Sequence, residues 1–176
     1  MNPSRPTTDT RILVIGKRGG ILHWPEHVVN ACRRLGMETR FLALNHQNFT
    51  DRVVKRAIGL FGRERAESHT ARQLEKLLTH FRPTLLIFPD IIAIPTPVQA
   101  VLIRHKSEFR SVSWIGDFFP DSVREYNRFI DRFYFTDSYL QEQAEKLGLN
   151  QPSYLPLAVD ETLFVKYAKP FEQRRD

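Results

Sequence analysis

The sequence predicts an α/β protein, with a doubly wound, Rossmann-like and mostly parallel sheet of about six strands and helices on both faces. Short apolar runs rich in β-branched and aromatic residues alternate along the chain with longer runs of helical period. Strands separated by helices imply right-handed β-α-β crossovers, which make neighbouring strands parallel. At 176 residues, of which 41% are hydrophobic, the chain is large enough to enclose one core.

The first predicted strand is Arg11–Ile15, a continuous apolar run followed by a glycine, as is typical of a strand buried on both faces. After a loop, Pro25 stands at the favourable first position of a helix, and an acid follows it where the helix dipole favours negative charge. We expect one stripe of this helix to face the core. That stripe carries Val28, Cys32 and Leu35, and Gly36 ends the helix.

The pattern between residues 51 and 81 is helical in period but is interrupted around Gly59 and Gly62, which predicts two helices. The core face of the second of these two helices consists of Ala71, Leu74, Leu77, Leu78 and Phe81. A later helix is predicted at 137–147, with a polar cap at Thr136 or Asp137. The remaining strands are predicted at 39–44, 84–88, 111–115, 132–135 and 153–155, with one more helix near 98–105.

The chain divides into a tail, one domain and a second tail. Residues 1–10 are polar and contain proline, so we expect them to be disordered, and they lack the apolar segment of a secretory signal. The predicted domain spans 11–165, and the polar residues 166–176 are predicted to be a linker or a frayed end. The longest apolar stretch, 84–103, contains three prolines and an acid, which argues against a membrane-spanning helix.

The net charge of +6 favours an anionic partner, whether a nucleotide, a phosphate, nucleic acid or an acidic membrane face. Nucleic acid is the weakest of these candidates, because no recognised motif is present and the aromatic residues fall mainly on the predicted core strands. The single cysteine, Cys32, excludes an internal disulfide and indicates a reducing compartment. We expect it to behave as a small buried hydrophobe.

The loop after the first strand has the composition of a phosphate site, and ligands of open parallel sheets bind at such strand ends. It consists of Gly16, Lys17, Arg18, Gly19 and Gly20, so that exposed backbone N–H groups and two cations suit a phosphate. It lacks the G-x-G-x-x-G dinucleotide fingerprint and the G-K-[ST] of a P-loop. A tight turn with solvated cations remains the alternative.

Three further residues near predicted strand ends are candidates for the site. Asp117 follows the strand at 111–115 beside a glycine and aromatic residues, where burial would strengthen it as a general base. Its alternative role is to cap the next helix, which Asp121 could do equally well. Asp90 follows another strand; it would also suit a receiver domain, but that class needs paired acids where this chain has two cations. His23, near the glycine loop, could contact a substrate, although a lone histidine is more often structural.

The segment Asp51–Arg65 (DRVVKRAIGLFGRER) mixes five cations with apolar side chains. A basic amphipathic segment of this kind could lie on an anionic membrane surface. The ordinary interpretation, which we prefer at this point, is a helix that packs its apolar side on the sheet.

The residues from 129 to 164 carry the most specific pattern in the chain. In order, it contains Asp131 before a strand, Ser138 at a helix start, Gly148 at the helix end, Leu155-Pro156, Asp160 and Phe164. This order resembles the end of the N-terminal domain of two-domain, GT-B fold glycosyltransferases. The stretch Trp114–Asp121 is similar to the tryptophan-to-aspartate-proline stretch of the CgeB-like (spore maturation) subgroup, with Asp117 at the position of its acid. Ala158 departs from the pattern, because relatives often carry glycine there.

The resemblance implies that this chain is the acceptor-binding, N-terminal half of an enzyme that transfers a sugar from a nucleotide-sugar to an acceptor. In the family a second domain binds most of the nucleotide-sugar, which is a co-substrate, and neither a cofactor nor a metal is expected. The glycine loop would then face the donor phosphates and the acceptor, and Asp117 would be the base of an inverting enzyme.

By the same resemblance, the chain alone is expected to be inactive. We expect it to be cytoplasmic, with the anionic inner face of the membrane as one candidate partner. The alternative is a non-catalytic, Rossmann-like interaction module that pairs with a separate subunit.

Overall fold

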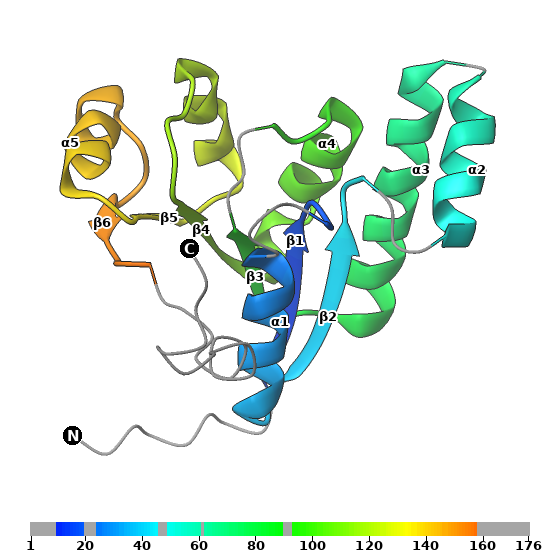
Figure 1. Ribbon diagram of the computed structural model, residues 1–176, viewed down its shortest axis with the longest axis horizontal. Coiled ribbons are helices and arrows are strands. Elements are labelled where there is room, and N and C mark those ends of the chain that lie inside the picture. The colour runs from blue at the N-terminus through cyan, green and yellow to red at the C-terminus, as the bar shows by residue number, and fades with distance from the viewer. Residues whose placement is uncertain (1–9, 20–23, 46–48, 61, 90–92, 158–176) are drawn as a thin grey trace, which may run out of the picture.

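The computed structural model describes residues 10–19, 24–45, 49–60, 62–89 and 93–157. In these ranges the chain forms a six-stranded, all-parallel sheet with strand order β2-β1-β3-β4-β5-β6 (Figure 1). The predicted α/β class, with a Rossmann-like doubly wound sheet, is confirmed. The strands are Arg11–Gly16 (β1), Glu38–Ala43 (β2), Leu85–Pro89 (β3), Arg110–Ile115 (β4), Arg132–Phe135 (β5) and Ser153–Tyr154 (β6).

Helices connect the strands, and most begin and end close to where the sequence places them. Asp137 is the cap of the last helix, since its side chain accepts a hydrogen bond from the Tyr139 N–H at 2.6 Å. Gly148 ends the same helix with a φ of 74°. The α-helices are Trp24–Arg34 (α1), Phe49–Gly59 (α2), Arg63–Lys76 (α3), Thr96–Arg104 (α4) and Ser138–Leu147 (α5). Helix α3 continues into a π-helical turn, Leu77–Phe81 (η1), and two 3₁₀ helices are Lys106–Glu108 (η2) and Asp121–Arg128 (η3).

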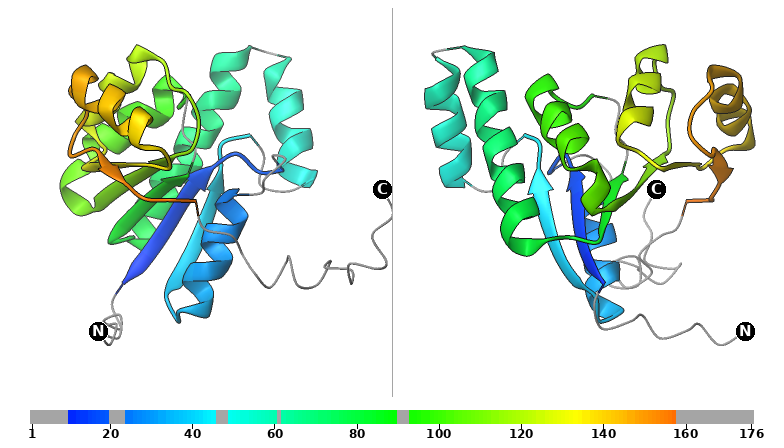
Figure 2. Two further views of the ribbon diagram at one scale, coloured as in Figure 1. Left: turned by 60° about the vertical axis from the view of Figure 1, so that its left-hand side comes forward. Right: turned by 180° about the vertical axis from the view of Figure 1, so that it is seen from behind.

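The two faces of the sheet are covered unequally. One face is covered by α3, α4, η3 and α5. Residues from these helices form one large buried cluster with side chains of β1 and β3 on the same face of the sheet. On the opposite face α1 packs over β1, β2 and β3, where it forms a small cluster with Ile12 and Val14 (Figure 2). Farther along this face, Val112, Trp114 and Tyr134 are only half-buried. Within the described residues, the sheet is therefore fully covered on one side and covered only near β1 on the other.

Helix α1 presents a different stripe to the sheet from the expected one. Its buried side chains are Trp24, Pro25, Val29 and Cys32, whereas Leu35, expected in the core, is 64% exposed. The prediction for Leu35 is wrong because the first turn of the helix sets its rotation, as Trp24 and Pro25 pack against the ends of β4 and β1. The predicted burial of Cys32 is confirmed.

Helix α2 does not pack on the sheet, so our preferred interpretation of residues 51–65 is wrong. The helix lies against α3, at the periphery of the molecule (Figure 1). Asp51 is its one buried residue, whereas Val53 is 51% exposed and Leu60, just after the helix, is 84% exposed. The predicted break between the two helices is confirmed at Gly62, whose φ of 116° favours glycine.

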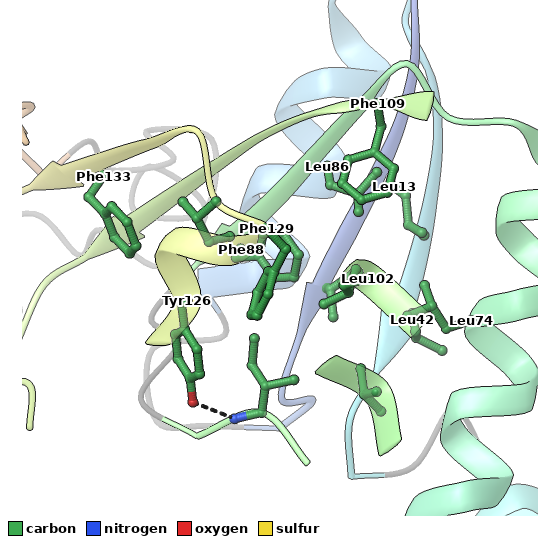
Figure 3. Close-up of a cluster of buried hydrophobic side chains, with 14 of the residues drawn as sticks. Leu13, Leu42, Leu74, Leu86, Phe88, Leu102, Phe109, Tyr126, Phe129 and Phe133 are labelled. Atoms are coloured by element: carbon green, nitrogen blue, oxygen red, sulfur yellow. Dashed lines mark hydrogen bonds between the residues drawn. The ribbon is translucent and has the colours of Figure 1, made fainter. Parts of the chain in front are cut away.

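The larger core contains aromatic residues from β3, from β5 and from η3 (Figure 3). Phe88, Phe129 and Phe133 are fully buried there, and Phe129 packs beside Tyr126 with ring centroids 5.3 Å apart. The Tyr126 hydroxyl accepts a hydrogen bond from the Ile94 N–H at 2.9 Å. This bond ties the segment before α4 to η3, so the core also fixes the chain that leads away from the end of β3.

The predicted tails, apart from Thr10, lie outside the described residues. So do the residues 158–165 that complete the predicted domain, including Ala158, Asp160 and Phe164. In the part of the chain that the structure describes, no helix is both long and apolar enough to cross a membrane.

Candidate functional site at the carboxyl edge of the sheet

All six strands run in the same direction, so the loops after β1, β3 and β4 leave the sheet at one edge. The chain reverses its direction of winding between β1 and β3, because β2 lies on one side of β1 and all later strands lie on the other. Open α/β sheets bind ligands at such a point, outside the carboxyl ends of the strands. Lys17, Arg18, Gly19 and Asp117 therefore belong to the same edge, although they do not follow neighbouring strands.

Two glycines at this edge make room for the start of α1. A Cβ on Gly16 would lie 2.7 Å from the ring of Pro25, and one on Gly116 would lie 2.8 Å from the ring of Trp24. Trp24 also meets Trp114 edge to face, with centroids 4.7 Å apart. Gly16, at the end of β1, therefore leaves the space in which the start of α1 packs. The residues next to it in the sequence do not predict this role.

The backbone of the β1 loop is held by side chains rather than left open. The Arg18 N–H donates to Oδ1 of Asn45 at 2.9 Å, and Nδ2 of Asn45 donates back to the Arg18 carbonyl at 2.8 Å. The Gly19 N–H donates to Oε1 of Glu26 at 3.3 Å. A phosphate bound by these two N–H groups would have to displace an amide and a carboxylate, so this part of the expected phosphate cradle has internal partners.

The side chains of the two cations in the β1 loop lie in different environments. The Arg18 guanidinium lies 5.5 Å from the centre of the Phe41 ring, on the edge strand β2. Lys17 instead lines an open cleft. The other predicted site residues, Gly20, His23 and Asp90, lie outside the described residues.

The cleft has a volume of about 770 Å³ and lies between the ends of β1 and β2, the α2–α3 pair and the start of α4. Its walls combine charged side chains of both signs and two threonines with apolar side chains, a lining that suits a ligand with both polar and apolar groups. The residues that line it are Lys17, Leu44, Asn45, Lys55, Glu64, Ala66, Glu67, Thr70, Ala93, Ile94, Pro95 and Thr96.

Lys55, a residue that we did not predict for the site, is held in the cleft wall by a buried carboxylate. Its Nζ lies 3.3 Å from Oδ2 of Asp51 and donates to the Asn45 carbonyl at 3.1 Å. Asp51 is 8% exposed and also accepts a hydrogen bond from Nε2 of Gln73 at 3.0 Å. The spacing of Asp51 and Lys55, four residues apart on a helix, was the available signal. The same network joins α2 to Asn45 and so to the β1 loop.

Asp117 does not have the environment that we expected. Its carboxylate is exposed, and Oδ1 accepts a hydrogen bond from the N–H of the next residue, Phe118, at 2.8 Å. The prediction that burial would strengthen Asp117 as a base is therefore wrong. The capping roles are wrong as well, since η3 begins after Pro120 and neither Asp117 nor Asp121 makes a side-chain cap.

The pattern that carries the family resemblance has structural roles where the structure describes it. Oδ2 of Asp131 accepts hydrogen bonds from the Ser111 N–H at 2.7 Å and from Lys106 Nζ at 2.6 Å. Burial by itself would raise the pKa of Asp131, but these bonds outweigh it, so the pKa lies below its ordinary value. Asp131 stands at the amino ends of β4 and β5, away from the cleft. It therefore supports the fold and not the site.

Within the described ranges, no group of three His, Cys, Asp or Glu side chains is placed to hold a metal ion. The sequence matches no model of a known protein family, and the curated proteins include none that is significantly similar to it.

Proposed function

We propose that the chain is the acceptor-binding, N-terminal half of a glycosyltransferase, and that the cleft beside the β1 loop receives the acceptor. The observation that carries the proposal is an open cleft of about 770 Å³, with charged residues in its lining, at the point where a parallel sheet reverses its winding. The nucleotide-sugar is the co-substrate, and a second domain binds most of it. Sugar transfer needs both substrates held together, so the chain alone is inactive in this proposal.

The lining of the cleft favours an acceptor that has hydroxyl groups and an anionic group. Lys17 and Lys55 offer cations, of which Lys17 has an exposed side chain. Glu64 and Glu67 can accept hydrogen bonds from sugar hydroxyls, and Thr70 adds a hydroxyl of its own. Asp117 is proposed as the base, working as an exposed carboxylate that a second domain would cover.

A buried group beside the Asp117 loop, outside the lining of the cleft, has a hydrogen-bond donor that is free within the described ranges. The indole N–H of Trp24 is buried and has no hydrogen-bond partner among the described residues. An unpaired buried donor costs about 1–3 kcal/mol, so a ligand oxygen that reached it would gain affinity. Trp24 packs against Gly116, one residue before Asp117.

The test is an NMR titration of the chain with two classes of ligand, sugar phosphates as acceptor analogues and UDP- or GDP-sugars as donors. We expect sugar phosphates to shift amide signals around Lys17, Asn45 and Lys55, and donors to bind weakly. Replacing Lys17 by Gln should weaken sugar-phosphate binding, whereas Lys76→Gln, at an exposed site on α3, should not. Tight binding of a donor to the chain alone would contradict the proposed division between two domains.

A specific observation also favours the second candidate, a non-catalytic interaction module that pairs with a separate subunit. Three apolar side chains after the ends of β4 and β6 are exposed: Phe118 to 75%, Leu155 to 40% and Leu157 to 57%. The half-covered sheet face beyond α1 adds further apolar surface. The gene's reading frame bears on the choice, because a second α/β domain encoded in frame favours a two-domain enzyme and one encoded by an adjacent gene favours a split enzyme.

A further inference from the structure

The amino edge of the sheet, opposite the cleft, has a second pocket with a volume of about 430 Å³. It lies where three neighbouring strands begin, because Arg11 is the first residue of β1, Thr84 precedes β3 and Phe109 precedes β4. Leu78, from the π-helical turn η1, and Arg82, just after that turn, also line it. The pocket is therefore separate from the cleft at the carboxyl edge.

Two arginines of this pocket lie close together. Nε of Arg11 donates a hydrogen bond to the Arg82 carbonyl at 2.9 Å, which brings the Arg11 guanidinium beside residue 82. Within the described residues, neither guanidinium pairs with an acid. Glu108, the acid of the pocket lining, instead lies 2.8 Å from Nδ1 of His105. The two arginines therefore carry positive charge that no side chain of the lining offsets.

Arg82 has a backbone conformation that favours glycine. Its φ of 50° and ψ of 62° are left-handed, and its N–H donates to the carbonyls of Leu77 and Leu78, which ends the helix. Glycine adopts this conformation without strain and is the usual residue at such a helix end. An arginine gives up that stability, and its exposed side chain gains nothing from burial in return. A binding role for the guanidinium accounts for an arginine at this position.

Apolar side chains and a rigid backbone complete the pocket. Pro83 and Phe109 are buried and belong to its lining. Thr84 joins the three strand starts, since its N–H donates to the Arg11 carbonyl at 2.8 Å and its carbonyl accepts from the Arg110 N–H at 3.0 Å. An apolar surface is thus held in a fixed place beside the two cations, which lowers the cost of ordering a bound ligand.

We propose that this pocket binds a small phosphate ester, with Arg11 and Arg82 on the phosphate and the organic group against Pro83 and Phe109. A phosphate dianion matches the charge of two arginines, and guanidinium groups bind phosphate oxygens through paired hydrogen bonds. A carboxylate would offset only one of the two charges, and inorganic phosphate would leave the apolar lining unused. The volume is near the lower end for small-molecule sites, which suits a small ester.

The experiment is an NMR titration of the chain with phenyl phosphate, inorganic phosphate and benzoate, followed at the Thr84 and Phe109 amides. Phenyl phosphate should bind most tightly of the three. Arg82→Gly should bind it about 10-fold more weakly, because hydrogen bonds to a charged group are lost. Its midpoint of urea unfolding should not fall, because glycine suits a φ of 50°. Arg11→Gln, which leaves residue 82 in place, should weaken binding by a similar factor.

The matched control is Arg124→Gln, which removes an exposed arginine of η3 and should bind phenyl phosphate as the unchanged chain does. Lys17→Gln, at the cleft, should also leave the shifts at Thr84 and Phe109 unchanged, so the result does not depend on the proposed acceptor site. The proposal is overturned if phenyl phosphate gives no saturable shifts at these two amides. Unchanged binding in either pocket variant, or an equal loss in Arg124→Gln, overturns it as well.

The other two probes test the chemical class of the ligand. If benzoate binds as tightly as phenyl phosphate, the two arginines do not recognise the charge of a phosphate. If inorganic phosphate binds as tightly, the apolar lining contributes nothing. Either result overturns the assignment of a phosphate ester.

Discussion

The ring of Trp24 fills the space that any side chain at position 116 would need, since a Cβ on Gly116 would lie 2.8 Å from it. Trp24 is the first residue of α1 and Gly116 follows the last residue of β4. The contact therefore joins the start of the helix after β1 to the loop that carries Asp117, and it fixes the rotation of α1 over the sheet.

We predict that Gly116→Ala destabilises the protein by about 1–3 kcal/mol, because an aromatic ring wedged between α1 and β4 cannot move aside as a flexible chain end could. Urea unfolding at equilibrium measures the change. Gly59→Ala is the control, since a Cβ there meets nothing within 4 Å and alanine favours the helix. A Gly116→Ala protein as stable as the Gly59→Ala protein would show that Trp24 is not held in this position.

Asn45→Ala should release the β1 loop. The two hydrogen bonds between Asn45 and the Arg18 backbone are lost, which costs about 1–2 kcal/mol and leaves the Arg18 N–H open to solvent. Amide hydrogen exchange at Arg18 should therefore become faster, and exchange in the middle of β1 should not. Asn30→Ala, at an exposed position of α1, should leave the Arg18 amide as it was. Unchanged exchange at Arg18 in the Asn45 variant would contradict the prediction.

His105 should make stability depend on pH near neutrality. Its Nε2 and Nδ1 each lie 2.8 Å from a carboxylate oxygen, of Glu75 and Glu108 respectively, and Arg104 binds the other oxygen of Glu75. Burial lowers the pKa of His105, but the two carboxylates outweigh it and raise the pKa above 6.5.

A raised folded-state pKa means that the charged histidine stabilises the fold fully below its unfolded pKa, which is near 6.5. This stabilisation is lost as the pH rises through the higher, folded-state pKa. We therefore expect the free energy of unfolding to fall on that alkaline side, and His105→Gln to remove this part of the decline. His80→Gln is the control, and an equal effect of the two variants on the pH profile would refute the assignment.

Asp131→Asn should destabilise the protein by about 2 kcal/mol at neutral pH, because it weakens hydrogen bonds from Lys106 and from the Ser111 N–H to a charged acceptor. The folded-state pKa of Asp131 lies below 3.8, so this stabilisation is present above pH 3.8 and is lost as the pH falls through the folded-state pKa. Urea unfolding should show a smaller difference in the free energy of unfolding between Asp131→Asn and the unchanged protein at about pH 3 than at pH 7. Asp121→Asn, at an exposed position, should match the unchanged protein at both pH values.

Part of the candidate site was visible in the sequence and part was not. The strand that ends at Gly16, the cation Lys17 beside a cleft, and the shared edge with Asp117 follow from parallel strands and from residues close together in the chain. Asn45 was not assigned to the site, because it reaches Arg18 in the β1 loop from a position far along the chain. The spacing of Asp51 and Lys55 indicated an ion pair on one helix, but only the fold places Lys55 at the Asn45 carbonyl. The exposure of Asp117 could not be predicted either, because the local sequence of an acid after a buried strand is the same whether or not another part of the chain covers it.

The sequence by itself determined which segments form helices and strands and where these end. Period, caps and turns act within a few residues, so the run at 132–135, a cap at Thr136 or Asp137 and the helix end at Gly148 could be placed before any tertiary contact is known, and the structure selects Asp137 as the cap. Only the tertiary structure decided which side of each helix is buried. Leu35 and Val53 have the apolar character of core residues, yet both are exposed. The reason is that α1 is turned by Trp24 and Pro25 against distant glycines, and α2 by the buried pairing of Asp51 with Lys55 and Gln73.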